Sequence, residues 1–286
     1  MDSGAEVARI LVTVKTYPNP SDAYGETVCV AGVRLDGGPR WIRLYPTLYR
    51  HVGYGQRFKK YEIIEVPVVP HGSKDPRPES HRPLQEGLTV IRKVDTKTDW
   101  RERKDLLGNL VGAVTTCELI RVNRETKYNK PAPSLGLVKM LDPEVSVLPG
   151  DPWSESQLAK AVRAASPTLF NPEGFKQLEP APYRVRFRYR CAFEKCAGHE
   201  PALLDWEAGE AGRKWRREYG PGEALDKLRE KYEKLLAPDK DSHLYIGNLH
   251  QHRTSFSALG VWYPPKVPCE SDLYESDLYE SDLFSF

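Results

Sequence analysis

The sequence has no long hydrophobic run. None of its apolar segments approaches the roughly 20 residues that a membrane-spanning helix needs. The N-terminal segment MDSGAEVARILVTV also lacks the basic start, apolar centre and small-residue cleavage site of a secretory signal. These two absences favour a cytoplasmic protein. With 286 residues, 40% of them hydrophobic and 29% charged, the chain is long enough to bury a core and to form more than one domain.

Several common catalytic motifs are also missing. The sequence has no P-loop and no G-x-G-x-x-G segment after a strand, which disfavours nucleotide hydrolysis and dinucleotide chemistry. It has no G-x-S-x-G elbow and no H-E-x-x-H helix, which disfavours the common serine hydrolases and zinc proteases. The net charge is only +2. Because the last twenty residues are acidic, the folded body is more basic than this total and is suited to binding phosphates.

Cysteine is scarce. Five cysteines, an odd number spread over a long chain, do not suggest a disulfide framework, so reduced thiols or metal ligands are the expected use. Cys191, Cys196 and His199 have the Cys-x4-Cys-x2-His spacing of a short metal knuckle. Zinc prefers thiolate and imidazole ligands, so the segment predicts a zinc site. The predicted fourth ligand is His250; the other candidates are His252, His243 and Asp205. The alternatives are that Cys191 is a core residue and His199 caps a turn, or that the two cysteines form a redox pair.

A second cluster combines carboxylates with histidines. Asp205 and Glu207 flank Trp206 near the start of an expected helix, where the helix dipole alone favours acidic residues. In the catalytic interpretation, one carboxylate acts as general base or holds a metal-bound water, and His250 or His252 is the proton partner. The His-x-His spacing places both rings on the same side of an extended chain. The alternative is an ordinary surface turn.

The segment YRVRFRYR (183–190) predicts the clearest strand of the chain. Its alternation places four arginines on one face, namely Arg184, Arg186, Arg188 and Arg190. This face is solvated, paired with acidic residues of a neighbouring element, or bound to nucleic-acid phosphates, which guanidinium groups contact well. Further nucleic-acid-binding candidates are Trp41 and Arg43 in the strand RWIRLYP (40–46), and Lys74 and Arg77 in the polar loop 71–83.

The expected fold class is α+β. Short strands between turn signals predict a small β-barrel in residues 1–98. Residues 99–182 are a helical and loop connecting region, with helices over 99–112 and 154–166 and a strand over 114–123. Residues 183–266 form an α+β domain with the strand 183–190, the Cys/His knuckle, two helices and a final hairpin of two strands. Residues 267–286 are an acidic tail with three E-S-D-L-Y/F repeats, expected to be disordered until it binds a partner.

The end of the tail, ESDLFSF, resembles the short peptides with which bacterial DNA repair and replication proteins bind the sliding clamp. Asp282, Leu283 and Phe284 carry this resemblance, while Glu280 stands where such peptides usually have glutamine. The tail is also similar to the acidic tip of single-strand-binding proteins. The resemblance implies that the tail binds a sliding clamp or another protein.

The body resembles uncharacterised bacterial proteins with a C-x-G-H…D-W-E segment and a later G-N-x-H turn, for which no activity is known. The predicted barrel resembles small barrels that bind nucleic acid. We therefore expect a protein that binds nucleic acid, with DNA as the first candidate, and that acts in DNA repair or antiviral defence. The alternatives are a metal-dependent, nuclease-like hydrolase and a non-catalytic scaffold that recruits a partner through its repeats.

Overall fold

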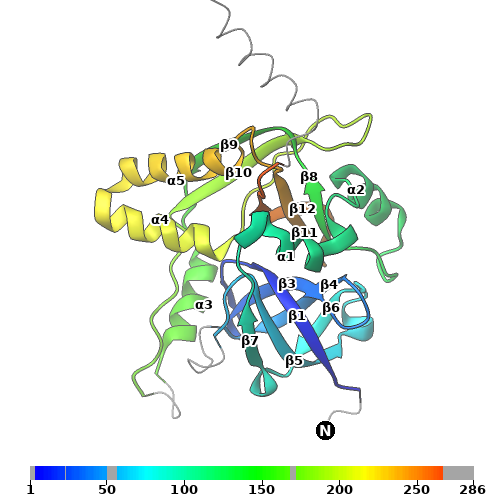
Figure 1. The fold of residues 1–286 in the computed structure, drawn as a ribbon. Helices are drawn as coiled ribbons and strands as arrows, with labels where there is room; N and C mark the ends of the chain where they lie inside the picture. Colours follow the sequence, from blue (N-terminus) through cyan, green and yellow to red (C-terminus); the bar gives the residue numbers. More distant parts are fainter. Residues whose placement is uncertain (1–3, 23, 50–56, 168–171, 267–286) are drawn as a thin grey trace, which may run out of the picture.

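The N-terminal part of the protein forms a closed five-stranded β-barrel, and the rest is a mixed α+β structure that packs against it (Figure 1). The structure is a computed structural model that describes residues 4–22, 24–49, 57–167 and 172–266. The predicted tail, with its docking residues Asp282, Leu283 and Phe284, lies outside the described residues. The α+β class and the N-terminal barrel expected from the sequence are confirmed.

The barrel consists of β1 (Glu6–Lys15), β3 (Gly25–Arg34), β4 (Arg40–Thr47), β6 (Ser80–Pro83) and β5 (Glu62–Pro70), in this spatial order. It closes because β5 also pairs with β1. All neighbouring strands are antiparallel except β4 and β6, which are parallel. Numbered along the chain, the five strands follow the order 1-2-3-5-4-1, which is the order of the OB-fold. The short strands β2 (Asn19–Ser21) and β7 (Thr89–Lys93) extend β3 and β5.

Apolar residues at alternate positions fill the barrel, including Ile10 and Val12 of β1, Val30 of β3 and Ile42 of β4. The predicted loop 71–83 contains a 3-10 turn (Gly72–Lys74). Its end forms β6, which lies between β4 and β5 in the barrel. Two further 3-10 turns cover Gln85–Gly87 and Gly108–Leu110.

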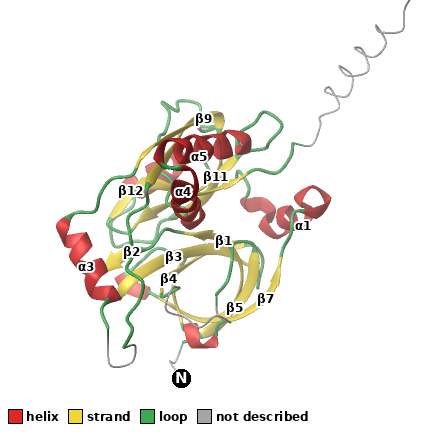
Figure 2. Ribbon diagram, turned by 90° about the vertical axis from the view of Figure 1, so that its left-hand side faces the viewer, coloured by secondary structure: helices red, strands yellow, loops and turns green. Residues whose placement is uncertain are grey.

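The C-terminal part contains two small sheets. One consists of β8 (Leu135–Lys139), β11 (His243–Leu249) and β12 (His252–Trp262), and the other pairs β9 (Leu141–Pro149) with β10 (Tyr183–Arg190). Helices α4 (Trp206–Tyr219) and α5 (Pro221–Leu235) form a hairpin over β9 and β10, whereas α3 (Glu155–Ala165) lies beside β2 and β3 of the barrel (Figure 2). The predicted connecting region 99–182 therefore supplies a strand to each sheet.

Residues 114–123, expected to be a strand, form most of helix α2 (Thr116–Glu125) instead. A capping box starts this helix: the Thr115 side chain accepts from the Glu118 backbone N–H, and the Glu118 carboxylate accepts from the Thr115 backbone N–H. These two bonds satisfy N–H groups that a helix start leaves unpaired. Leu119 is buried on the inner face of the helix. Helix α1 (Lys97–Leu107) overlaps the helix predicted over 99–112, but it begins two residues earlier and ends five residues earlier.

One core cluster joins the barrel to the C-terminal part. Val14 and Val33 of the barrel pack there with Leu137, Tyr245 and Trp262 of the sheet formed by β8, β11 and β12. The outer face of the barrel around Val14 of β1 and Val33 of β3 is therefore covered by the C-terminal part. No helix within the described residues is long and apolar enough to cross a membrane.

Candidate metal centre and cleft

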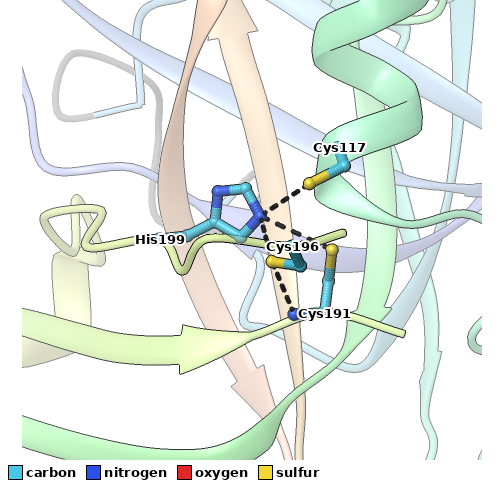
Figure 3. A group of neighbouring side chains, drawn as sticks. All are labelled: Cys117, Cys191, Cys196 and His199. Carbon is cyan, nitrogen blue, oxygen red and sulfur yellow. Dashed lines mark hydrogen bonds between the residues drawn. The ribbon is translucent and has the colours of Figure 1, made fainter. Parts of the chain in front are cut away.

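Three cysteines and a histidine meet at one point of the C-terminal part (Figure 3). The ligand atoms of Cys117, Cys191, Cys196 and His199 all lie within 4.8 Å of one another. The His199 Nε2 is 3.4 Å from the Cys117 Sγ, 3.5 Å from the Cys191 Sγ and 3.3 Å from the Cys196 Sγ. A tetrahedral zinc ion, with bonds of ~2.3 Å to sulfur and ~2.0 Å to nitrogen, spaces such atoms by about 3.5 Å. These four residues could therefore hold a metal ion.

Local backbone structure explains how the hairpin after β10 presents three of these ligands. The backbones of Tyr189 and His199 exchange two hydrogen bonds of 2.8 and 3.1 Å, which place His199 opposite the end of the strand. The N–H groups of Cys191 and Gly198 each donate to the Cys196 Sγ at 3.4 Å. Gly198 has a φ of +103°, a conformation that favours glycine.

Helix α2 supplies the remaining ligand. Cys117 lies in its first turn, and the adjacent Thr116 hydroxyl bonds the Tyr189 hydroxyl at 2.8 Å, so the start of the helix is fixed against β10. The Nε2 of His199 faces the three sulfurs, and burial lowers the pKa of this imidazole. The neutral ring that results is the form that ligates a metal.

The thiols differ in their electrostatic surroundings. Burial raises the pKa of the Cys117 thiol to about 12. Burial also acts to raise the pKa of Cys196, but the two backbone N–H donors and the neighbouring thiols outweigh it, and the net shift is downward. Cys196 therefore loses its proton more readily than Cys117, a step that metal binding requires.

The predicted ligands Cys191, Cys196 and His199 come together, but His250 does not join them. Its ring lies against the Tyr128 ring at 4.9 Å, and its Nδ1 is 3.7 Å from Asp75 Oδ1. Cys117 is the ligand that the sequence interpretation missed. The signal was weak, because this cysteine stands alone, 82 residues before His199, in a segment taken for a strand.

A cleft of about 740 Å³ lies where the barrel meets the C-terminal part. The outer face of β3 and β4 forms one side through Thr27, Cys29, Arg43 and Tyr45. The other side includes Trp153, Arg184, Asn248 and His250. No contact between the barrel strands and these C-terminal residues was expected from the sequence, where they lie far apart, and they meet in the folded chain.

Buried polar atoms gather around this cleft. The Nε of Arg43, the Nε of Arg184, the Oδ1 of Asn248 and the Nδ1 of His250 have no hydrogen-bond partner among the described residues. Arg43 and Asn248 are only 4% and 2% exposed. An unpaired buried polar group costs about 1–3 kcal/mol, so such groups usually serve a bound molecule or a function. Their concentration here favours a binding site.

The predicted nucleic-acid-binding residues of the barrel have different surroundings. Arg43 is buried: its guanidinium donates to the Cys29 Sγ and to the carbonyl and hydroxyl of Ser134, each at 3.2 Å. Arg77 forms a two-bond ion pair with Asp75 and donates to the Asn248 carbonyl at 2.9 Å. Both line the cleft. Trp41 packs edge-on against Tyr245 at 6.2 Å, on the covered side of the barrel, and Lys74 is exposed.

Every arginine of the β10 row has an acidic partner. Arg184 pairs with Asp151, Arg186 with Glu200, Arg188 with Glu144 and Arg190 with Asp142. Arg188 and Arg190 are also exposed, so the row is both ion-paired and solvated. Of its four arginines, only Arg184 lines the cleft.

The carboxylates of the predicted catalytic cluster bind a lysine. Asp205 accepts from the Glu207 backbone N–H at 2.8 Å and so caps helix α4. The Lys60 Nζ is 2.6 Å from Asp205 and 3.0 Å from Glu207, and these carboxylates raise the pKa of that amine although burial opposes them. Asp205 and His250 line the same cleft, whereas His252 is exposed at the start of β12.

Two families match the chain. Residues 6–109 match the family described as "Domain of unknown function (DUF8758)", and residues 112–281 match "Domain of unknown function (DUF8757)". No curated protein matches. The first match covers the barrel and α1, and the second covers the metal centre and its sheets. Since the second match spans more than half of its residues, the chain belongs to the DUF8757 family.

Proposed function

We propose that this protein binds single-stranded nucleic acid, DNA in the first place, in the cleft on the outer face of β3 and β4. The observation that carries the proposal is the position of the cleft. OB-fold barrels bind oligonucleotides on the face of their second and third strands. In this chain those strands are β3 and β4, and their residues Cys29, Arg43 and Tyr45 line the cleft.

The side chains of the cleft suit this ligand. Tyr17, Tyr45 and Trp153 offer aromatic rings, on which bases stack whatever their sequence. Arg184 and Lys160 bring cationic groups to the cleft, where they pair with Asp151 and Asp22. Asp22, Asp151 and Asp205 balance most of the positive charge, so stacking and hydrogen bonding contribute more here than net charge.

We infer that the metal is zinc and that its role is structural. Three thiolates and one imidazole are a zinc ligand set, and four protein ligands leave no open position for a substrate or a water. The ion would tie α2 to the hairpin after β10. Elemental measurement on the purified protein should find one zinc per chain; a chain that folds fully without metal contradicts this role.

The binding proposal is tested with fluorescent oligonucleotides of DNA and RNA, single-stranded and duplex, over a series of salt concentrations. Tyr45→Ala should weaken single-strand binding about tenfold, because base stacking on an aromatic ring is worth about 1–3 kcal/mol. Tyr219→Ala removes a comparably exposed tyrosine that does not line the cleft and should leave affinity unchanged. Absence of binding to any single strand, or equal effects of the two variants, would refute the proposal.

A further inference from the structure

A second hollow, of about 690 Å³, adjoins the cleft. Gly150, Asp151, Pro180 and Ala181 line both, so the two hollows share one wall. The far side of the second hollow is formed by arginines of helix α4, Arg213, Arg216 and Arg217. A nucleic-acid strand that is bound in the cleft and continues across this wall would reach the arginines next.

The three arginines are spaced i, i+3 and i+4, so they lie on one face of α4. Arg213 has a structural role: its guanidinium donates to the carbonyls of Glu179 and Pro180 and lies over the Tyr17 ring at 5.0 Å. These contacts fix the segment 179–180 that forms part of the shared wall. Arg213 thereby couples the wall to the helix.

Arg216 and Arg217 differ from the arginines of β10. Both are exposed, and neither has a described carboxylate within 4.0 Å. Their position in the last turn of α4 is favourable in itself, because the helix dipole attracts cations there. Asp151 and Glu179 also line the second hollow, but Asp151 is paired with Arg184, and no ion pair among the described residues joins Glu179 to Arg216 or Arg217. The two guanidinium groups therefore lack the paired carboxylates that the arginines of β10 have.

We propose that Arg216 and Arg217 extend the binding site, so that a single strand held in the cleft continues over the shared wall and its next phosphates contact these two arginines. This inference rests on the proposed function, since it extends the path of the same ligand. The cleft binds bases, and the α4 arginines bind backbone. The site therefore takes a longer strand than the cleft alone.

The test compares a short oligonucleotide of about four nucleotides with one of about twelve, within the range that single OB-fold sites cover. The double variant Arg216→Gln with Arg217→Gln should weaken binding of the long strand about tenfold and leave the short strand unchanged. Its salt dependence, the slope of log affinity against log salt, should become shallower by about 1.4, because each phosphate contact on a single strand contributes about 0.7.

The matched control is Lys214→Gln with Arg229→Gln, which removes the same charge from α4 and α5 outside both hollows. It should change neither affinity. If the short strand binds but the long strand is insensitive to Arg216 and Arg217, or the control has the same effect, the extension is refuted and the cleft proposal stands. If the wild-type chain binds neither strand, both proposals are refuted.

Discussion

Cys117 shows how one side chain completes a site that is otherwise local in sequence. The other three ligands lie within nine residues of one another, and their spacing alone indicated the knuckle. Cys117 comes from a helix that packs on the knuckle from another part of the chain. Because its role depends on tertiary structure, the spacing in the sequence could not reveal it. His250 was predicted as the fourth ligand instead, and that prediction was wrong.

Replacing Cys117 by serine should remove zinc. A hydroxyl is a poor zinc ligand, and three remaining ligands do not close a tetrahedral structural site. We expect the metal content to fall from one zinc per chain to near zero, with a lower melting temperature, as measured by elemental analysis and thermal unfolding. Cys29→Ser, at another half-buried free thiol, should retain the metal. Full zinc content in the Cys117 variant would contradict the assignment.

Lys15 is a buried lysine with an unusual environment. Its Nζ lies 4.1 Å from the Tyr49 ring centre and 5.2 Å from that of Trp206, and it is 6% exposed. Burial lowers the pKa of this amine from 10.5 to about 8. Between these two values the unfolded chain holds a proton that the folded chain has lost. The free energy of unfolding must therefore rise with pH across that window.

Lys15→Met should remove this rise. The lowered pKa corresponds to a rise of about 3 kcal/mol in the free energy of unfolding between pH 8 and pH 10.5. Cation–π contacts with the aromatic rings stabilise the charged amine and reduce this rise. Urea unfolding at pH 7.5, 9 and 10.5 measures the effect as the difference between variant and wild type. That difference cancels the opposite contribution of buried tyrosines such as Tyr245, whose pKa is raised. Parallel pH profiles for the two proteins would contradict the prediction.

At the scale of elements, most helices and strands were predictable because their local signals agree. Ser154 and Gln157 form the capping box expected for α3, and Gly220 and Pro221 separate α4 from α5 as expected. Helix α2 was missed because valine, threonine and isoleucine favour strands, while its capping box is a signal of only two residues. Strand β6 was missed because its pairing with β4 and β5 is long-range.

The hairpin after β10 depends on the backbone of Gly198. Gly198→Ala should destabilise the metal-bound protein by more than about 1 kcal/mol and weaken zinc binding, since alanine resists a φ of +103°. Chemical unfolding and a zinc chelator competition measure the two effects. Gly222→Ala, in the first turn of α5 with open space around it, should be neutral or stabilising. Equal behaviour of the two variants would show that the hairpin does not require glycine.

At the scale of the whole molecule, buried ion pairs and hydrogen bonds join the two family domains. Arg77 connects Asp75 of the barrel with the Asn248 carbonyl of β11, 171 residues away. Arg43 reaches Ser134 in the same way. Contacts at this separation leave no trace in local patterns, so the cleft could not be predicted although the barrel and the knuckle were.

Arg77→Met should cost about 1–3 kcal/mol, because it leaves the half-buried Asp75 carboxylate without the guanidinium that pairs with it. Burial acts to raise the pKa of Asp75, but the Arg77 guanidinium outweighs it and holds that pKa well below its usual value. The loss should therefore be largest above pH 4 and shrink as the carboxyl is protonated. Urea unfolding at pH 7 and pH 3 checks both. Arg92→Met, at the exposed pair with Glu102, should cost under about 1 kcal/mol.

A single cluster of aromatic rings crosses the border between the two family matches. Tyr61 and Trp100 stand on one side of the border and Tyr245 and Trp262 on the other, and the Trp100 and Trp262 rings are 5.0 Å apart. A fusion joint or truncation placed between residues 109 and 112 would strip these rings of their neighbours and expose them to water on both fragments. We therefore expect that neither fragment folds well alone, and that each of them aggregates under conditions in which the intact protein does not.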